Sequence, residues 1–256
     1  MTFSPEWQAP ADLLADRVVF ITGASEGIGR AAAKTFAAHG ATIVAVSRTV
    51  ARLESLYDEI VAAGHPEPVI QGVDLVGVTM NDCRQLADAV GEAFGRVDVV
   101  LHNASLLGDR VPLDRYDAET WRKVMAANVD SAFMLTQAFL PWLEHGASPR
   151  VLFTSSGAGL RPRAYWGAYA VSKAATEALM QVFADENERL AKTAFATINP
   201  GGTRTAMRAA AVPGEDPSLL PAPEDLMPLY LWLAGSAEKS EINGASIDAR
   251  GFLGIA

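Results

Sequence analysis

Residues 22–29 read Thr22-Gly23-Ala24-Ser25-Glu26-Gly27-Ile28-Gly29, and they stand between a short apolar run and a segment with helical periodicity. The run before them, Arg17–Thr22, is apolar and β-branched, which predicts a buried parallel strand. The segment after them, Gly27–His39, predicts a helix that ends at Gly40. Glycines at such a junction permit a tight turn and let backbone N–H groups approach a pyrophosphate beside the positive end of the helix. The stretch therefore predicts a dinucleotide-binding loop.

Apolar runs and helical segments alternate along almost the whole chain. The further predicted strands are Ala41–Ser47, Val69–Val73, Val97–His102, Arg150–Thr154, Thr193–Ile198 and, near the end, Ala245–Asp248; the further predicted helices are Ala51–Ala63, Asn81–Phe94, Ala118–Leu143, Ala168–Leu190 and, approximately, Glu224–Leu233. This alternation predicts an α/β fold, namely a Rossmann-type doubly wound parallel sheet of about seven strands with helices on both faces, in a three-layer sandwich. No linker or change of composition interrupts residues 1–256, so a single domain is expected. We interpret Thr205–Ala222 as a mobile lid, and a plain surface loop is the alternative.

The charge and the residue content exclude several classes of function. The formal net charge is −9, so phosphates repel the chain, and neither a nucleic acid nor a membrane is an expected partner. The single cysteine, Cys83, excludes an intrachain disulfide and is typical of a reducing compartment. The four histidines lack the short spacings of a metal site, so no metal is expected. No segment has the pattern of a secretory signal or a membrane helix, which predicts a cytoplasmic location.

Tyr169 and Lys173 form a Y-x-x-x-K pattern inside the predicted helix Ala168–Leu190. Residues four apart share one face of a helix, so the ammonium group of Lys173 can lie beneath the phenol of Tyr169. A nearby cation stabilises the phenolate and lowers the pKa of the tyrosine toward the working pH. Tyr169 is therefore a candidate general acid and base for a proton transfer.

The T-G-x-x-x-G-x-G spacing of the glycine loop resembles the short-chain dehydrogenase/reductase family, and the resemblance covers essentially the whole chain. It implies an NAD(P)-dependent oxidoreductase that transfers a hydride between a nicotinamide and a carbonyl or alcohol substrate. Ser156 lies 13 residues before Tyr169, the family's spacing, which implies that it orients the substrate oxygen; Ser155 is the competing candidate. Asn128, an unfavourable residue within a helix, stands where the family has an asparagine that holds a water of the proton relay to Lys173.

The resemblance also implies which residues bind the cofactor. Asp74-Leu75 stands where the family contacts adenine, and Asn103-Ala104 stands where an asparagine braces the sheet and borders the ribose. The neighbouring His102 and Ser105 depart from the family's Asn-Asn-Ala-Gly, and we interpret His102 as a buried, hydrogen-bonded residue. The cofactor-binding candidates are Gly23, Ser25, Glu26, Gly27, Ile28, Gly29, Arg48, Asp74, Leu75, Asn103, Ala104, Tyr169, Lys173, Pro200, Gly201, Thr203 and Thr205.

The end of the second predicted strand indicates which dinucleotide binds. An acidic residue there accepts hydrogen bonds from an adenosine ribose and repels a 2′-phosphate, but this chain has Ser47-Arg48-Thr49. Arg48 can contact a 2′-phosphate, and Ser25 can join it from the glycine loop. Glu26 favours the opposite preference, because its position is often basic in family members that prefer NADP. We expect NADP(H), with NAD(H) as the alternative.

Within the family, the chain is similar to the YciK-like bacterial oxidoreductases, whose substrate is unsettled. The residues that carry this similarity are LHNASLLG (101–108), WGAYAVSK (166–173), INPGGTRTAMRA (198–209) and DLMPLYLWL (225–233). A homodimer or homotetramer is expected, because the two long apolar helices correspond to the family's dimer interface. Two alternatives stay open: a non-catalytic dinucleotide sensor, and an epimerase or dehydratase on the same fold.

Four arginines flank the predicted catalytic residues. Arg161 and Arg163 lie between Ser156 and Tyr169, and Arg204 and Arg208 follow the Pro-Gly turn. If they converge at the carboxyl ends of the strands, they form a positive patch that binds an anionic carbonyl compound. Solvated surface arginines are the alternative.

Overall fold

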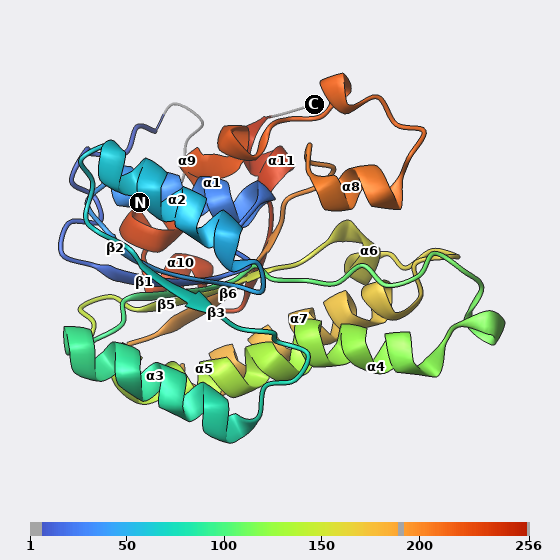
Figure 1. Ribbon diagram of the computed structural model, residues 1–256, viewed down its shortest axis with the longest axis horizontal. Helices are drawn as coiled ribbons and strands as arrows, with labels where there is room; N and C mark the ends of the chain where they lie inside the picture. Colours follow the sequence, from blue (N-terminus) through green and yellow to red (C-terminus); the bar gives the residue numbers. More distant parts are fainter. Residues whose placement is uncertain (1–6, 189–191, 255–256) are drawn as a thin grey trace.

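We describe the fold from a computed structural model, which defines residues 7–188 and 192–254. Seven strands form one sheet in the order β3-β2-β1-β4-β5-β6-β7, and every neighbouring pair is parallel (Figure 1). The strands are β1 (Val18–Thr22), β2 (Thr42–Ser47), β3 (Val69–Gly72), β4 (Val99–His102), β5 (Arg150–Thr154), β6 (Ala194–Asn199) and β7 (Ala245–Asp248). The predicted doubly wound α/β fold is confirmed. The predicted strands Arg150–Thr154 and Ala245–Asp248 match the observed ones, and the other five differ by one or two residues at one or both ends.

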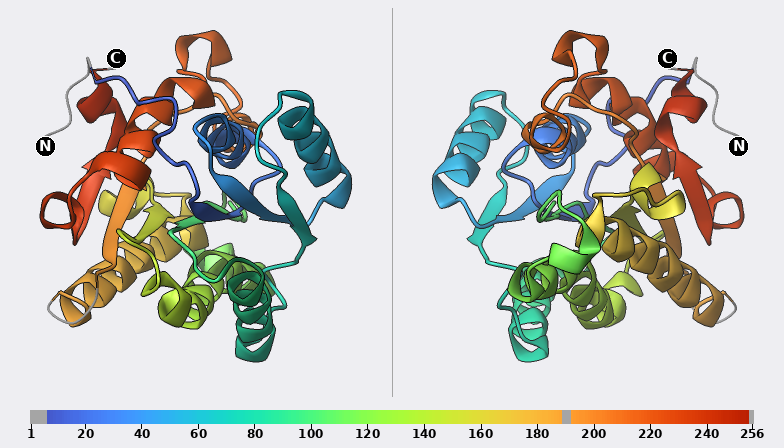
Figure 2. Two further views of the ribbon diagram at one scale, coloured as in Figure 1. Left: turned by 90° about the vertical axis from the view of Figure 1, so that its left-hand side faces the viewer. Right: turned by 90° about the vertical axis from the view of Figure 1, so that its right-hand side faces the viewer.

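Helices cover both faces of the sheet (Figures 1 and 2). The α-helices are α1 (Gly27–Ala38), α2 (Val50–Ala62), α3 (Met80–Phe94), α4 (Ala118–Met125), α5 (Ser131–Leu143), α6 (Gly157–Leu160), α7 (Gly167–Glu186), α8 (Ala206–Ala211), α9 (Met227–Leu231), α10 (Lys239–Ile242) and α11 (Ala249–Leu253); short 3₁₀ and π segments are η1 (Leu113–Arg115), η2 (Ala126–Asp130), η3 (Pro217–Leu219), η4 (Pro223–Leu226) and η5 (Trp232–Ser236). α1, α2 and α9 lie on one face, and α3, α5 and α7 lie on the other. None of the helices in the described ranges is long and apolar enough to cross a bilayer.

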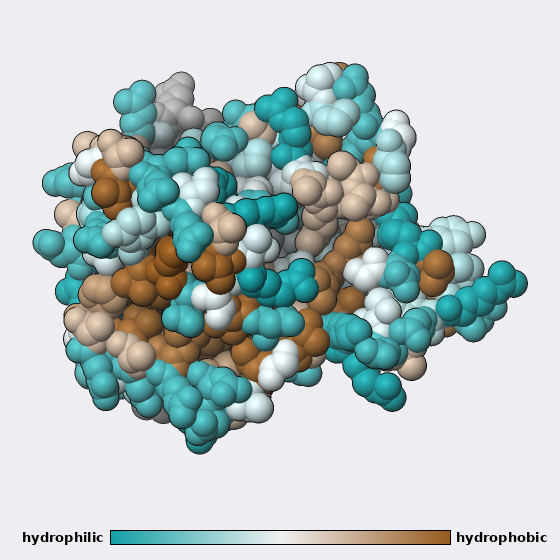
Figure 3. Space-filling view, viewed as in Figure 1, coloured by the Kyte–Doolittle hydropathy of each residue, from teal (hydrophilic) through white to brown (hydrophobic). Residues whose placement is uncertain are grey.

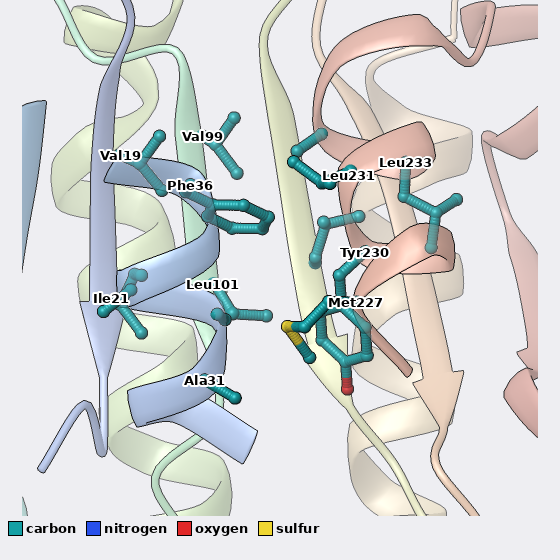
Figure 4. Close-up of a cluster of buried hydrophobic side chains, with 14 of the residues drawn as sticks. Val19, Ile21, Ala31, Phe36, Val99, Leu101, Met227, Tyr230, Leu231 and Leu233 are labelled. Carbon is teal, nitrogen blue, oxygen red and sulfur yellow. The ribbon is translucent and has the colours of Figure 1, made fainter. Parts of the chain in front are cut away.

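Two apolar layers hold the helices to the sheet. On the α1 side, alternate residues of the central strands, such as Ile21 and Leu101, lie beside Phe36 of α1, and the cluster extends to Leu233 of η5 (Figure 4). The residues between them point to the α5 and α7 side, where Phe20 lies with its ring centroid 4.5 Å from that of Phe139. Strands buried on both faces require nearly continuous apolar runs, which explains the composition of β1, β4 and β5.

The structure corrects several predicted helices. The segment predicted as one helix, Ala118–Leu143, is divided into α4 and α5 by the π turn η2, which contains Asn128. The predicted Ala168–Leu190 helix ends at Glu186, and positions 189 and 190 lie outside the described residues. The four-residue α6 and α10 were not predicted, because one helical turn is too short to show a periodic pattern.

The predicted lid, Thr205–Ala222, contains the short helix α8 and the turn η3. It lies above the carboxyl ends of the strands, with α4 and α6 below it (Figure 2, right). Its predicted mobility stays a prediction. β3 is the edge strand at one side of the sheet. Apolar side chains reach the surface near it (Figure 3), and Val50 and Val69 are among the exposed ones.

Candidate active site

One continuous cavity lies at the carboxyl ends of the strands and encloses about 1370 Å³, its open mouth included. Ligands of doubly wound sheets bind at this edge, where the strand order reverses between β1 and β4. Nearly all the predicted cofactor and catalytic residues line this cavity. Those that line it are Gly23, Ser25, Glu26, Gly27, Ile28, Arg48, Asp74, Leu75, Asn103, Ala104, Ser156, Tyr169, Lys173, Pro200, Gly201, Thr203 and Thr205. Gly29 and Asn128 lie behind the wall and act through their neighbours.

The glycine loop permits a close approach between β1, α1 and the end of β4. Gly23 has φ +67°, and a Cβ there would lie 2.8 Å from the Cα of Ala104. A Cβ on Gly29 would lie 2.3 Å from the carbonyl oxygen of Gly23 and 2.5 Å from Nδ2 of Asn103. Only glycine fits either position, so the loop keeps its backbone open toward the cavity. The side chain of Glu26, the N-cap residue of α1, does not cap this helix. The arrangement fits a pyrophosphate at the helix N-terminus.

The end of β4 is tied to its two neighbouring strands. The Thr22 hydroxyl accepts hydrogen bonds from the backbone N–H groups of Asn103 and Ala104, each at 3.1 Å. The Asn103 amide donates to the Gly23 carbonyl at 3.3 Å, and its oxygen accepts from the Thr154 hydroxyl at 3.3 Å. Asn103 therefore links β1 and β5, which is the bracing predicted for it.

Two departures from the family pattern have local explanations. His102 is buried, and its Nε2 lies 2.8 Å from the Thr136 hydroxyl, as predicted. Burial lowers the pKa of His102 to about 3, so the ring is neutral at physiological pH. Ser105 is not among the described non-glycine residues with positive φ, so the family's glycine is not needed here for its backbone freedom.

Several hydrogen-bonding side chains lie beside the carboxyl end of β2, where the adenosine part of a cofactor is expected. The Ser25 and Ser47 hydroxyls lie 2.7 Å apart, and the exposed Arg48 follows them on the cavity wall. Glu26 forms an ion pair with Arg52 at the surface. This pair offsets the negative charge of Glu26, which was the one feature that argued against a 2′-phosphate.

Ser156, Tyr169 and Lys173 lie together on the opposite wall. Ser156 is the N-cap residue of α6, and Tyr169 and Lys173 lie in the first two turns of α7. The Lys173 ammonium donates to the Thr154 carbonyl at 2.7 Å and lies 5.7 Å from the centroid of the Tyr169 ring. Ser156, and not Ser155, is among the groups that act on the pKa of the Tyr169 phenol. The Ser155 hydroxyl is buried and has no partner among the described residues, so the geometry favours Ser156.

The pKa values of the tyrosine and the lysine differ from the predicted pattern. Burial raises the pKa of Tyr169, and the Ser156 hydrogen bond and the charge of Arg208 only partly oppose this rise. The expected lowering of this pKa by Lys173 is therefore wrong for this arrangement. Burial instead lowers the pKa of Lys173 to about 8, and the charge of Glu177 opposes that shift. Both effects have one cause, because a poorly solvated site disfavours the charged form of each group.

Asn128 connects three segments around the site. Its side-chain amide donates to the Leu106 carbonyl at 3.0 Å and to the Ser172 hydroxyl at 2.9 Å, and its oxygen accepts from the Leu106 N–H at 2.7 Å. The residue thus fixes the loop after β4 against α7. Both amide hydrogens are used, so only the second lone pair of Oδ1 remains on the side chain for a water.

Several cavity residues were not predicted. They are Ser47, Val73, Val76, Ser105, Leu106, Leu107, Ala127, Thr154, Ser155, Ala206, Arg208 and Ala211, of which Ser105, Ser155 and Arg208 had been considered in other roles. Most belong to loops beyond the strand ends, where sequence periodicity carries no signal. The apolar residues expected beside the substrate were Leu160, Trp166 and Met207, of which Trp166 and Met207 line the cavity and Leu160 does not.

The predicted patch of four arginines does not form. Arg161 and Arg163 are exposed and are not among the residues that line the cavity, and Arg204 faces a separate hollow beside Arg30 of α1. Only Arg208 reaches the cavity, and it is paired with Glu215.

Comparison with known proteins decides the family. Residues 17–216 match the family described as short chain dehydrogenase. The chain belongs to this family. It is 46% identical over 244 residues to the uncharacterized oxidoreductase YciK of Escherichia coli K12, a match that covers 95% of this chain and 96% of YciK.

Solved structures of similar proteins have the same architecture. A short chain dehydrogenase of Shigella flexneri 2a, crystallised in complex with NADP, is 46% identical, with a TM-score of 0.90 over 94% of this chain and all of the other. One from Escherichia coli CFT073, in complex with NADPH, is 47% identical, with a TM-score of 0.90 over 94% of this chain and 99% of the other. The chain is thus an oxidoreductase of the short-chain type, similar to YciK, as predicted.

Proposed function

We propose that this chain reduces a carbonyl compound with NADPH, with Tyr169 as the general acid and base. The observation that carries this proposal is the placement of Ser156, Tyr169 and Lys173 on one wall of the cavity whose other end is the glycine loop. One cavity can therefore hold a dinucleotide along the strand ends and a small substrate beside the tyrosine. Ser156, Tyr169 and Lys173 together favour an oxidoreductase over a protein that only binds the nucleotide as a sensor.

Each side chain has a role that its surroundings support. Ser156 donates a hydrogen bond to the substrate oxygen, and Tyr169 donates its phenolic proton to the same oxygen. Because burial raises the pKa of Tyr169, the phenol is protonated at neutral pH, as an acid must be. Lys173 returns the proton, and a pKa of about 8 suits a group that gains and loses protons near neutrality. Asn128 completes the relay through a water on Oδ1. A bound nicotinamide supplies the hydride.

The test is the oxidation of NADPH, followed at 340 nm, with purified protein and a mixed panel of ketones and aldehydes. Turnover of at least one carbonyl compound is expected, and the Tyr169→Phe variant provides the blank. NADPH binding without turnover on a broad panel would instead favour a nucleotide sensor.

We propose NADP(H) as the cofactor because Ser25, Ser47 and Arg48 surround the place of a 2′-phosphate and two similar proteins were crystallised with NADP or NADPH.

Arg48→Asp is expected to lower the ratio of kcat/KM for NADPH over NADH by about tenfold or more, since it replaces a phosphate partner with a carboxylate that repels phosphate. The matched control is Arg161→Asp, the same change of charge on an exposed side chain outside the cavity. A wild-type preference for NADH would contradict the assignment of Arg48 and favour Glu26 as the deciding residue.

We further propose that the chain forms a homodimer or homotetramer through α5 and α7, in the cytoplasm. Phe133 of α5 and Val171 and Val182 of α7 are 39%, 42% and 53% exposed, although each is apolar. Apolar side chains on adjacent helices are typical of an interface. Light scattering is expected to give a mass of two or four chains, and Val182→Glu to reduce it. An unchanged mass in that variant would place the interface elsewhere.

A further inference from the structure

The substrate end of the cavity is built from apolar side chains. Trp166 lies with its ring centroid 5.8 Å from that of Tyr169. Met207 and Ala211 of α8, and Leu106 and Leu107 of the loop after β4, line the same cavity. The body of a substrate whose oxygen lies at Ser156 and Tyr169 would therefore contact hydrocarbon groups. The polar groups Arg48, Glu26 and Asp74 belong to the other end, beyond β2 and β3.

One cation besides Lys173 reaches the substrate end. Within residues 7–188 and 192–254, the cationic side chains that line the cavity are Arg48, Lys173 and Arg208. Arg208 lies close enough to Tyr169 for each charge to act on the pKa of the other. An unpaired guanidinium at this place would attract a carboxylate or a phosphate.

Glu215 pairs with that guanidinium through two hydrogen bonds. Nε and one terminal nitrogen of Arg208 donate to the two carboxylate oxygens of Glu215, at 2.5 and 2.6 Å. The pair is only partly exposed, with 29% of the Arg208 and 26% of the Glu215 side-chain surface accessible, so water weakens it less than a surface pair. Arg208 lowers the pKa of Glu215, which keeps the carboxylate charged at neutral pH. The pair thus adds no net charge to this end of the cavity.

A second arginine fixes the apolar wall. The Arg110 guanidinium lies 4.0 Å from the centroid of the Trp166 ring, donates to the Tyr165 carbonyl at 2.9 Å, and donates to the Ala211 carbonyl of α8 at 2.6 Å. It therefore joins the loop after β4, the segment before α7 and the predicted lid. A wall held from three sides is preformed, which favours a rigid apolar body in the pocket.

We propose that the substrate is an uncharged carbonyl compound with an apolar body, and that Glu215 determines this specificity by occupying Arg208. The proposal rests on the proposed function, since it concerns the substrate of the same site. Glu215 is a positioning residue, because it acts through Arg208 and does not itself reach the reacting atoms. Removing its charge should leave the pocket intact and free a guanidinium for an anionic group.

The test uses NADPH-loaded protein and two ligands that do not react, octanoate and octanamide, measured by calorimetry. The wild type is expected to bind octanamide at least as tightly as octanoate. Glu215→Gln keeps the shape of the side chain and is expected to raise the affinity for octanoate about tenfold, with little change for octanamide, because it frees a charge-assisted donor pair. High salt should diminish the gain. The double variant Glu215→Gln/Arg208→Gln should lose it, and Glu224→Gln, an exposed carboxylate outside this cavity, should not produce it.

A stronger wild-type affinity for octanoate, or an equal change for both ligands in Glu215→Gln, would overturn the proposal. Because these ligands need no turnover, the binding result stands apart from the proposed function. A protein that binds as expected but reduces nothing on the carbonyl panel refutes the reductase assignment alone. With a substrate in hand, kcat/KM for a matched pair of neutral and anionic ketones should show the same reversal in Glu215→Gln.

Discussion

Tyr169→Phe is expected to lower kcat at least about a hundredfold while NADPH binding stays within a few-fold of the wild type. The substitution removes the phenolic hydroxyl, which is the proposed proton donor, and keeps the ring that packs beside Trp166. Tyr169 is buried, so the ring alone should preserve the wall of the pocket. The measurements are NADPH oxidation under saturating substrate and NADPH affinity from fluorescence.

A control separates chemistry from folding in this experiment. Tyr165→Phe removes a hydroxyl from a neighbouring, 55%-exposed tyrosine and should leave kcat nearly unchanged. Near-normal turnover in Tyr169→Phe would refute Tyr169 as the general acid. Ser156 would then be the next candidate for the proton donor, and Ser156→Ala would test it.

Gly29→Ala is expected to lower the free energy of unfolding by about 3 kcal/mol, the upper end of the usual cost of overpacking. The added methyl group would lie 2.3 Å from the Gly23 carbonyl oxygen and 2.5 Å from Nδ2 of Asn103, and the first of these neighbours is backbone. α1 must therefore move away from β1, which disturbs the glycine loop and the Asn103 brace together. NADPH affinity should fall about a hundredfold, because the backbone N–H groups at the N-terminus of α1 would no longer point toward the pyrophosphate.

Gly77→Ala is the matched control for this substitution. Gly77 lies in the turn after β3, has no positive φ, and a Cβ there would meet nothing within 4 Å. Denaturant unfolding and NADPH titration of both variants give the comparison. If Gly29→Ala were as stable as Gly77→Ala and bound NADPH normally, the close approach of α1 to β1 would not be needed for the site.

The local patterns predicted the elements that are long and strongly periodic. β1, α1 and α3 lie within one or two residues of their predicted positions, because a buried parallel strand and an amphipathic helix each impose a period on the sequence. The π turn at Asn128 was not predicted. A single extra residue in a helical turn leaves the apolar pattern on either side almost unchanged, so the interruption depends on the hydrogen bonds that Asn128 makes to Leu106 and Ser172.

The placement of the site followed from the sequence for similar reasons. Parallel strands end at one edge of the sheet, so residues that follow different strands, such as Gly23, Asn103 and Ser156, had to converge there. Spacing along one helix likewise placed Tyr169 and Lys173 on one face. These are short-range rules of backbone geometry, and a linear sequence contains all that they need.

The charge state of the site depended on contacts that no linear pattern records. Burial raises the pKa of Tyr169 and lowers that of Lys173, which reverses the shift expected from their spacing alone. Arg208 pairs with Glu215 across the turn after α8, whereas Arg161 lies outside the cavity. Desolvation and pairing are set by whatever surrounds a group in three dimensions, and for these side chains the surroundings come from distant segments. The fold and the convergence of the predicted site residues at one cavity were therefore predictable from the sequence, and the electrostatics of the pocket were decided by tertiary packing.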